Sequence, residues 1–138
     1  MSFWRTPAYV RDLQIFEETV ALAQFTDGDG GATLGTYVCT FDLPVNFWVD
    51  RAILTDVTGF AGDTTATIQI GDGTDVDRLN TGTPSVFASA TIVDLGVPSG
   101  VRPVTTAYKP KITVTAGSDF TAVTAGKLTL QVWGYVVR

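Results

Sequence analysis

Three aspartates at close spacing are the residues of this chain whose types most directly suggest chemistry. Asp72, Asp75 and Asp77 lie among glycines in the stretch QIGDGTDVDRLNTGTPSVF, residues 69–87. Clustered carboxylates could bind calcium, or could act as catalytic acids and bases. Aspartates that follow an apolar alternation are also typical of a turn, where their side chains accept backbone N–H bonds. These interpretations predict a calcium-dependent module, an enzyme or a structural protein, respectively.

Calcium binding needs more than this stretch offers. Gly71, Gly73 and Asp75 match the G-x-G-x-D part of a calcium-binding nonapeptide repeat, but that architecture requires stacked copies. A second acidic run, DGDGG at residues 27–31, resembles the start of an EF-hand without its flanking helices or its distal glutamate. We therefore predict a turn with no metal and no cofactor, and keep the three aspartates as weak metal candidates.

Catalytic constellations are hard to assemble from this composition. The chain has no histidine and one cysteine, so Ser-His-Asp, Cys-His and zinc sites of nitrogen and sulfur ligands are excluded. Its two glutamates, Glu17 and Glu18, are adjacent, and neighbours on a strand point to opposite faces. Cys39 lies in the alternating stretch TYVCTFDL and is interpreted as a small strand residue. The sequence predicts a protein that is not an enzyme.

Composition restricts the partners. The 138 residues carry a net charge of −5, with nine Lys and Arg, which argues against a nucleic-acid partner. No run of 18 apolar residues occurs, so we expect no membrane-spanning helix and no membrane partner. The first residues, MSFWRTPAYVRD, lack the apolar region of a signal peptide, and the single cysteine can form no internal disulfide. We expect synthesis in a reducing cytoplasm.

The elements that must position these residues are strands. Residues 13–25 could be a helix, but we favour a strand over 17–25 that runs into the turn TDGDGG. Turn residues separate further alternating stretches, with short candidates near SVFAS and TIVDLG. The clearest alternating stretches are residues 33–44, 47–60, 65–71, 111–117 and 126–137. We predict an all-β fold, a single antiparallel β-sandwich that is jelly-roll-like, with an N-terminal arm at 1–16 and the sandwich domain at 17–138.

Large aromatic residues suggest contact surfaces. Phe3, Trp4 and Arg5 lie in the predicted arm, and two large aromatics are unusual in a solvated tail. We predict that these three residues contact a partner; packing of the arm on its own domain is the alternative. Trp48 and Trp133 fall inside predicted strands and are interpreted as core or interface residues, or as a sugar-binding platform.

Several phrases of the sequence resemble small structural proteins of tailed bacteriophages. They are GATLGTYVCTFDLP, TDVTGFAGDTTATIQIGDG, ATIQIGDGTDVDRLNTGTPSVF, DLGVPSG and KITVTAGSDFTAVTAGKLTLQVWGY, spread over residues 17–137. The resemblance implies a virion component of the head decoration, or cement, type, without catalytic residues. It implies binding to the major capsid protein on the outer capsid surface, often as a homotrimer, after synthesis in the bacterial host cytoplasm.

Two other functions remain open at this stage. The domain could be a host-recognition or carbohydrate-binding module of a tail fibre or head fibre. It could also be a tail or head–tail connector subunit, which the copy number per virion would distinguish from a cement protein.

Overall fold

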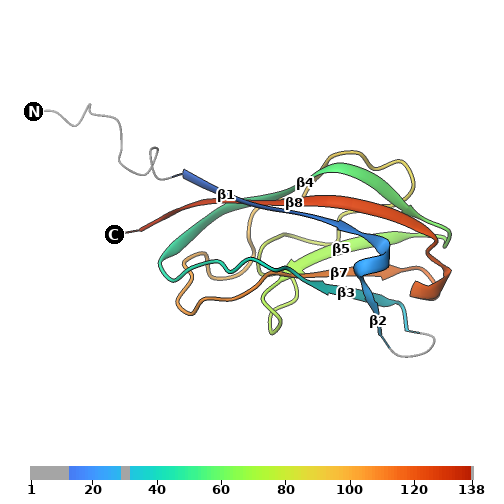
Figure 1. The fold of residues 1–138 in the computed structure, drawn as a ribbon, viewed down its shortest axis with the longest axis horizontal. Coiled ribbons are helices and arrows are strands. Elements are labelled where there is room, and N and C mark those ends of the chain that lie inside the picture. Colours follow the sequence, from blue (N-terminus) through green and yellow to red (C-terminus); the bar gives the residue numbers. More distant parts are fainter. Residues whose placement is uncertain (1–12, 29–31, 138) are drawn as a thin grey trace, which may run out of the picture.

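A computed structural model describes residues 13–28 and 32–137 of the chain, and it forms two packed antiparallel sheets (Figure 1). Sheet A has the strand order β1-β8-β4-β6 and sheet B has the order β2-β3-β7-β5. The strands are β1 (Leu13–Ala21), β2 (Thr26–Asp27), β3 (Leu34–Val38), β4 (Phe47–Ala61), β5 (Ala66–Gly71), β6 (Val93–Asp94), β7 (Lys111–Ala116) and β8 (Ala125–Val136). The predicted β-sandwich is confirmed.

Successive strands change sheets along most of the chain. From β4 onward, each strand lies in the sheet opposite to that of the strand before it. The jelly-roll connectivity expected from the sequence stays a prediction, and this alternation favours it. The described part of the chain contains no helix long and apolar enough to cross a membrane.

Period-two alternation accounts for the core. Ala66, Ile68 and Ile70 alternate along β5 and are buried. An alternating set in β8 is also buried, and its aliphatic members belong to the same cluster as Ile112 and Val114 of sheet B. That set is Leu128, Leu130, Val132 and Gly134. Both sheets contribute to one cluster of buried apolar side chains.

The first strand differs from its prediction at both ends. β1 begins at Leu13 instead of residue 17, so residues 13–16, assigned to the arm, belong to sheet A. It ends at Ala21 because a 3₁₀ turn, Leu22–Gln24, follows and leads the chain into sheet B. In that turn the Phe25 amide donates to the Leu22 carbonyl at 3.0 Å.

The strand predicted over residues 33–44 is also shorter. Regular pairing of β3 with β7 stops at Val38, which lies opposite Lys111. Beyond it the chain keeps isolated contacts: the Cys39 amide donates to the Pro110 carbonyl at 2.8 Å, and Leu43 bridges Tyr108. Cys39 is 1% exposed, and burial raises the pKa of its thiol to about 12, which agrees with a packing role.

Candidate interaction surface

The acidic loop after β5 is closed by its own hydrogen bonds. Asp72 Oδ1 accepts the backbone amides of Thr74 at 2.8 Å and Asp75 at 2.7 Å, and Asp72 Oδ2 pairs with Arg78 at 2.8 Å. Desolvation by itself would raise the pKa of Asp72, but these amides and the guanidinium hold it below its usual range. Among the described residues, no group of three or more metal-ligating side chains could hold a metal ion. The turn interpretation accounts for this geometry.

Arg78 joins this loop to a distant segment of the chain. Besides Asp72, its guanidinium donates to the carbonyls of Val101 at 3.2 Å and Pro103 at 3.3 Å. It also lies 4.7 Å from the centre of the Tyr108 ring. The 101–103 segment in turn borders the start of β4, since Pro103 bridges Trp48. The acidic loop therefore acts as a support for that end of sheet A.

Replacing Arg78 with methionine is expected to lower the free energy of unfolding by about 3 kcal/mol, because the Asp72 charge stays largely buried without its partner. Both side chains are only about one-sixth exposed, at 16% and 15%. The ionised Asp72 stabilises the fold above its ordinary pKa, and this stabilisation is lost as pH falls through its lowered pKa in the folded state. R78M should therefore also make the free energy of unfolding depend less on pH in the acid range. Urea unfolding at pH 7 and pH 3 measures both effects. Lys109→Met, which breaks an exposed pair with Asp42, is the control and should cost less than about 1 kcal/mol; an equal loss in both variants would contradict this account.

The two glutamates of β1 lie on opposite faces, as predicted. Glu17 accepts from the Gln131 side chain on the outer face of sheet A. Glu18 accepts from the Tyr37 hydroxyl, and also from the Thr40 amide at 2.8 Å and hydroxyl at 2.7 Å, next to sheet B. The hydrogen bond to Glu18, with burial, raises the pKa of Tyr37 to about 12. The two carboxylates therefore do not face one substrate, and Glu18 serves to join the two sheets.

Rows of paired residues define the outer face of sheet A, because directly opposite residues on antiparallel strands point the same way. One row joins Leu13, Tyr135 and Trp48 across β1, β8 and β4. The next row joins Ile15 and Trp133 with Arg51, after a bulge in β4 between Val49 and Arg51. We call the apolar part of these two rows the aromatic face. It consists of Leu13, Ile15, Trp48, Trp133 and Tyr135.

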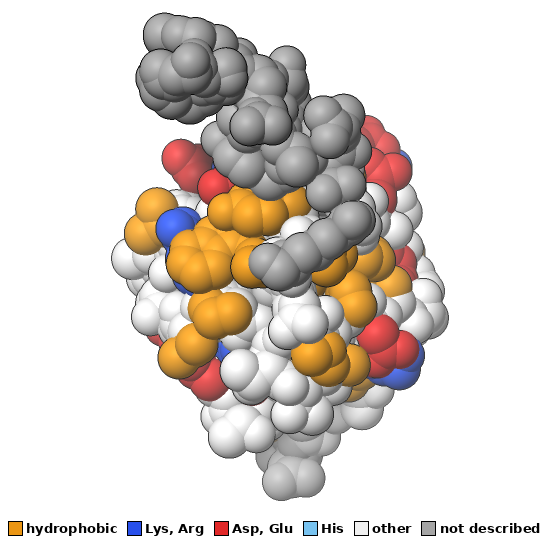
Figure 2. Space-filling view, turned by 90° about the vertical axis from the view of Figure 1, so that its left-hand side faces the viewer, with side chains coloured by type: hydrophobic (Ala, Val, Ile, Leu, Met, Phe, Trp, Pro, Cys, Tyr) orange, Lys and Arg blue, Asp and Glu red, His pale blue; other side chains and the backbone are white. Residues whose placement is uncertain are grey.

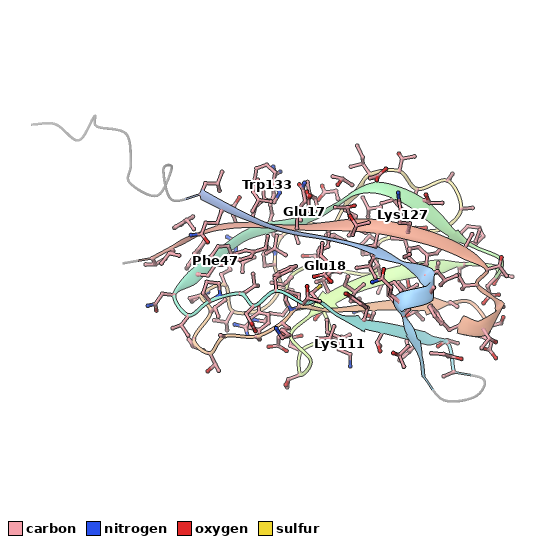
Figure 3. The ribbon with its side chains drawn as sticks, in the orientation of Figure 1. Glu17, Glu18, Phe47, Lys111, Lys127 and Trp133 are labelled. Atoms are coloured by element: carbon pink, nitrogen blue, oxygen red, sulfur yellow. The ribbon has the colours of Figure 1, made fainter. Side chains whose placement is uncertain are left out.

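The aromatic face is accessible to a partner. Leu13 is 48% and Ile15 is 46% exposed, and both tryptophans are partly exposed. Trp133 projects away from sheet B, whereas Phe47 lies between the sheets (Figure 3). Figure 2 shows hydrophobic side chains gathered at the end of the molecule that lies at the left in Figure 1. Exposed apolar patches of this kind mark interaction sites on soluble proteins.

Polar neighbours fix the tryptophan rings in place. The Arg51 guanidinium lies 4.9 Å from the centre of the Trp133 ring, and Arg102 lies 5.9 Å from that of Trp48. Trp133 Nε1 donates to Gln131 Oε1 at 3.1 Å, and Gln131 donates onward to Glu17. The next row contains Glu17, Gln131 and Ile53, and the row after it contains Thr19, Thr129 and Thr55, so the apolar residues of this face are concentrated at one end.

The sequence predicted part of this surface. Trp48 and Trp133 were interpreted as core or interface residues, or as a sugar-binding platform, and the structure places both on the outer face of sheet A. Leu13 and Ile15 fell in the predicted arm; the signal for an outward strand face was that these two apolar residues are two positions apart. The predicted contact residues Phe3, Trp4 and Arg5 lie outside the described residues.

No protein-family model matches the sequence, and no curated protein matches it. A solved chain described as "Cyanophage Pam1 capsid asymmetric unit" has a TM-score of 0.64 to this structure, covering 91% of this chain and 86% of that one. The shared property is the fold. At 14% sequence identity the likeness carries no function or residue role across.

Proposed function

We propose that this protein is a non-enzymatic head decoration, or cement, protein of a tailed bacteriophage. It binds the lattice of the major capsid protein on the outer surface of the virion and stabilises the head. The aromatic face carries the proposal, because it combines exposed aliphatic residues, two partly exposed tryptophans and neighbouring arginines at one end of a rigid sheet. Tryptophan and arginine are enriched among the residues that dominate binding energy. A chain from a phage capsid has the same fold, which is compatible with this role.

Lattice binding explains how a small domain could stabilise a shell. A protein that binds the assembled lattice better than free subunits shifts the equilibrium toward assembly by mass action. Repetition over the shell, and assembly of the protein as a homotrimer, would add avidity to each contact. The net charge of −5 suits a surface that faces solvent and is repelled by packaged DNA.

Carbohydrate binding is the second candidate, because two tryptophans share one accessible face. Sugars stack on the flat faces of aromatic rings, and the Arg51 guanidinium already lies over one face of Trp133. The arrangement therefore fits a protein contact better than a sugar platform. Saturable binding of the isolated domain on a glycan array would instead favour host recognition.

Heads that lack this protein provide the test of the proposed role. Virions grown without it should package DNA but lose infectivity faster on heating, and adding the purified protein should restore their resistance. Heads that are equally stable with and without the protein would contradict the proposal. Copies confined to the tail or to one vertex would point to a connector subunit.

The N-terminal residues are proposed as a second anchor. Deletion of residues 1–8, which removes Phe3, Trp4 and Arg5, should weaken binding to capsids and leave the thermal unfolding of the domain unchanged. The measurement is cosedimentation with heads that lack the protein. If the truncated protein binds as well as the full chain, the arm is not part of the interface.

A further inference from the structure

β1 is the edge strand of sheet A, and it is paired on one side only, with β8. In the described part of the chain the other three edges are shorter or covered. The edge strands β2 and β6 have two residues each. The edge of β5 is covered by residues 84–86, through hydrogen bonds of 3.0 Å from Ile68 to Pro84 and 2.9 Å from Val86 to Ala66. The nine residues of β1 are thus the longest edge available for strand pairing.

One hydrogen bond shows which amides face outward on this edge. The Ala21 amide donates to the Gln24 side chain at 2.9 Å, so it points away from β8. Backbone groups of a strand alternate between its two sides with a period of two. The amides of Leu13, Ile15, Glu17 and Thr19 therefore point in the same direction as that of Ala21. The same four residues carry the outward side chains of the aromatic face and its border.

The edge lacks most of the devices that prevent strand addition. Natural edges are blocked by short length, bulges, proline or charged side chains, above all lysine. β1 contains neither lysine nor proline, and its pairing with β8 runs without a register shift from Leu13 to Ala21. Its two charged residues already have partners within the domain, Gln131 for Glu17 and Tyr37 with Thr40 for Glu18. Leu13 and Ile15 extend the apolar surface directly to this edge. A segment that pairs with β1 would therefore remain in contact with the aromatic face.

The side chains of β1 indicate the chemistry of the added strand. An aliphatic residue fits opposite Ile15, and a lysine, arginine or hydroxyl residue fits opposite Glu17. A second copy of this chain fits poorly in the full-length antiparallel register. That pairing is centred on Glu17 and would place two carboxylates opposite each other.

We infer that the outer edge of β1 binds an extended segment of the partner protein as an additional strand of sheet A. The inference rests on the proposed function only in taking the capsid protein as that partner. Backbone hydrogen bonds from the β1 amides would provide affinity, and the aromatic face with Glu17 would provide register and specificity.

Hydrogen exchange on the full-length protein tests the inference at single-residue resolution. The protein is bound to heads that lack it, exchanged in deuterated buffer, released and read amide by amide. The amides of Ile15, Glu17 and Thr19 should exchange fast in the free protein and slowly in the bound protein. The amides of Phe16 and Glu18, already paired with β8, should be protected in both states. Binding without new protection at the three outward amides overturns strand addition alone, whereas absence of binding overturns the proposed function with it.

Two substitutions at Ile15 distinguish the contribution of its backbone amide to binding from that of its side chain. Ile15→Pro removes an outward amide and no ladder bond to β8, and Ile15→Ala removes a similar amount of side chain but keeps the amide. I15P should bind heads about tenfold more weakly than I15A. Equal binding of two folded variants contradicts strand addition. If the free protein instead forms dimers that protect the same amides, the edge pairs with a second copy and the assignment to the capsid protein is wrong.

Discussion

Trp133→Ala is expected to weaken binding of the protein to capsids about a hundredfold, the size of effect seen when a central tryptophan is removed from an interface. The ring projects from the outer face of sheet A, where Arg51 and the Gln131–Glu17 pair hold it in one orientation. An ordered ring loses little freedom on binding, so most of its contact area contributes to affinity. Titration of heads that lack the protein, followed by sedimentation, gives the dissociation constants.

The control for this variant lies on the same strand. Lys127 pairs with Asp56, and both side chains are well exposed, at 41% and 74%. Lys127→Ala should bind within about twofold of the wild type, because exposed ion pairs contribute little. W133A should also keep the unfolding transition of the wild type, since the ring lies outside the buried cluster. Equal binding of W133A and K127A would show that the aromatic face is not part of the interface.

Gly134→Val is expected to destabilise the fold by at least about 3 kcal/mol through overpacking between β8 and β4. A Cβ at this position would lie 2.1 Å from the Trp48 carbonyl oxygen and 2.6 Å from the Phe47 ring. Phe47 is fully buried and the Trp48 backbone belongs to the adjacent strand, so neither can move without separating the two strands. Chemical denaturation followed by tryptophan fluorescence would report the loss.

A second glycine shows whether crowding is the cause. At Gly73 no atom lies within 4 Å of an added Cβ, although its φ of +95° disfavours a side chain. Gly73→Ala should therefore lower the free energy of unfolding by only about 1–2 kcal/mol, which is the cost of a side chain at a positive φ. A larger loss for G73A than for G134V would contradict the packing account of Gly134.

The sequence predicted the strands best where one face is buried and the other is not. In β5 and β8 the buried aliphatic residues follow a period of two, so the apolar pattern predicts which face is buried. β1 breaks this relation, because apolar residues occupy both faces: Phe16 and Val20 pack inward, while Leu13 and Ile15 point outward. Its first residues were therefore assigned to an arm. Apolar residues on both faces of the strand blur the period-two pattern; the proposed contact with a partner would explain the outward pair.

The acidic loop shows a second limit of local sequence. Arg78 lies six residues beyond Asp72, and pairing between them could be expected from the sequence. The carbonyls of Val101 and Pro103 and the ring of Tyr108 reach Arg78 only through the tertiary fold. The same contacts link the loop to the segment beside Trp48. What looked like a chemical site is a support for the surface that we propose to be functional.

A map of the virion at side-chain resolution would test the central claim most directly. The account predicts that this sandwich covers the outer surface of the head in many copies, with Trp133 and the outer edge of β1 against the major capsid protein. A head without this density, or copies with the aromatic face turned to solvent, would contradict it.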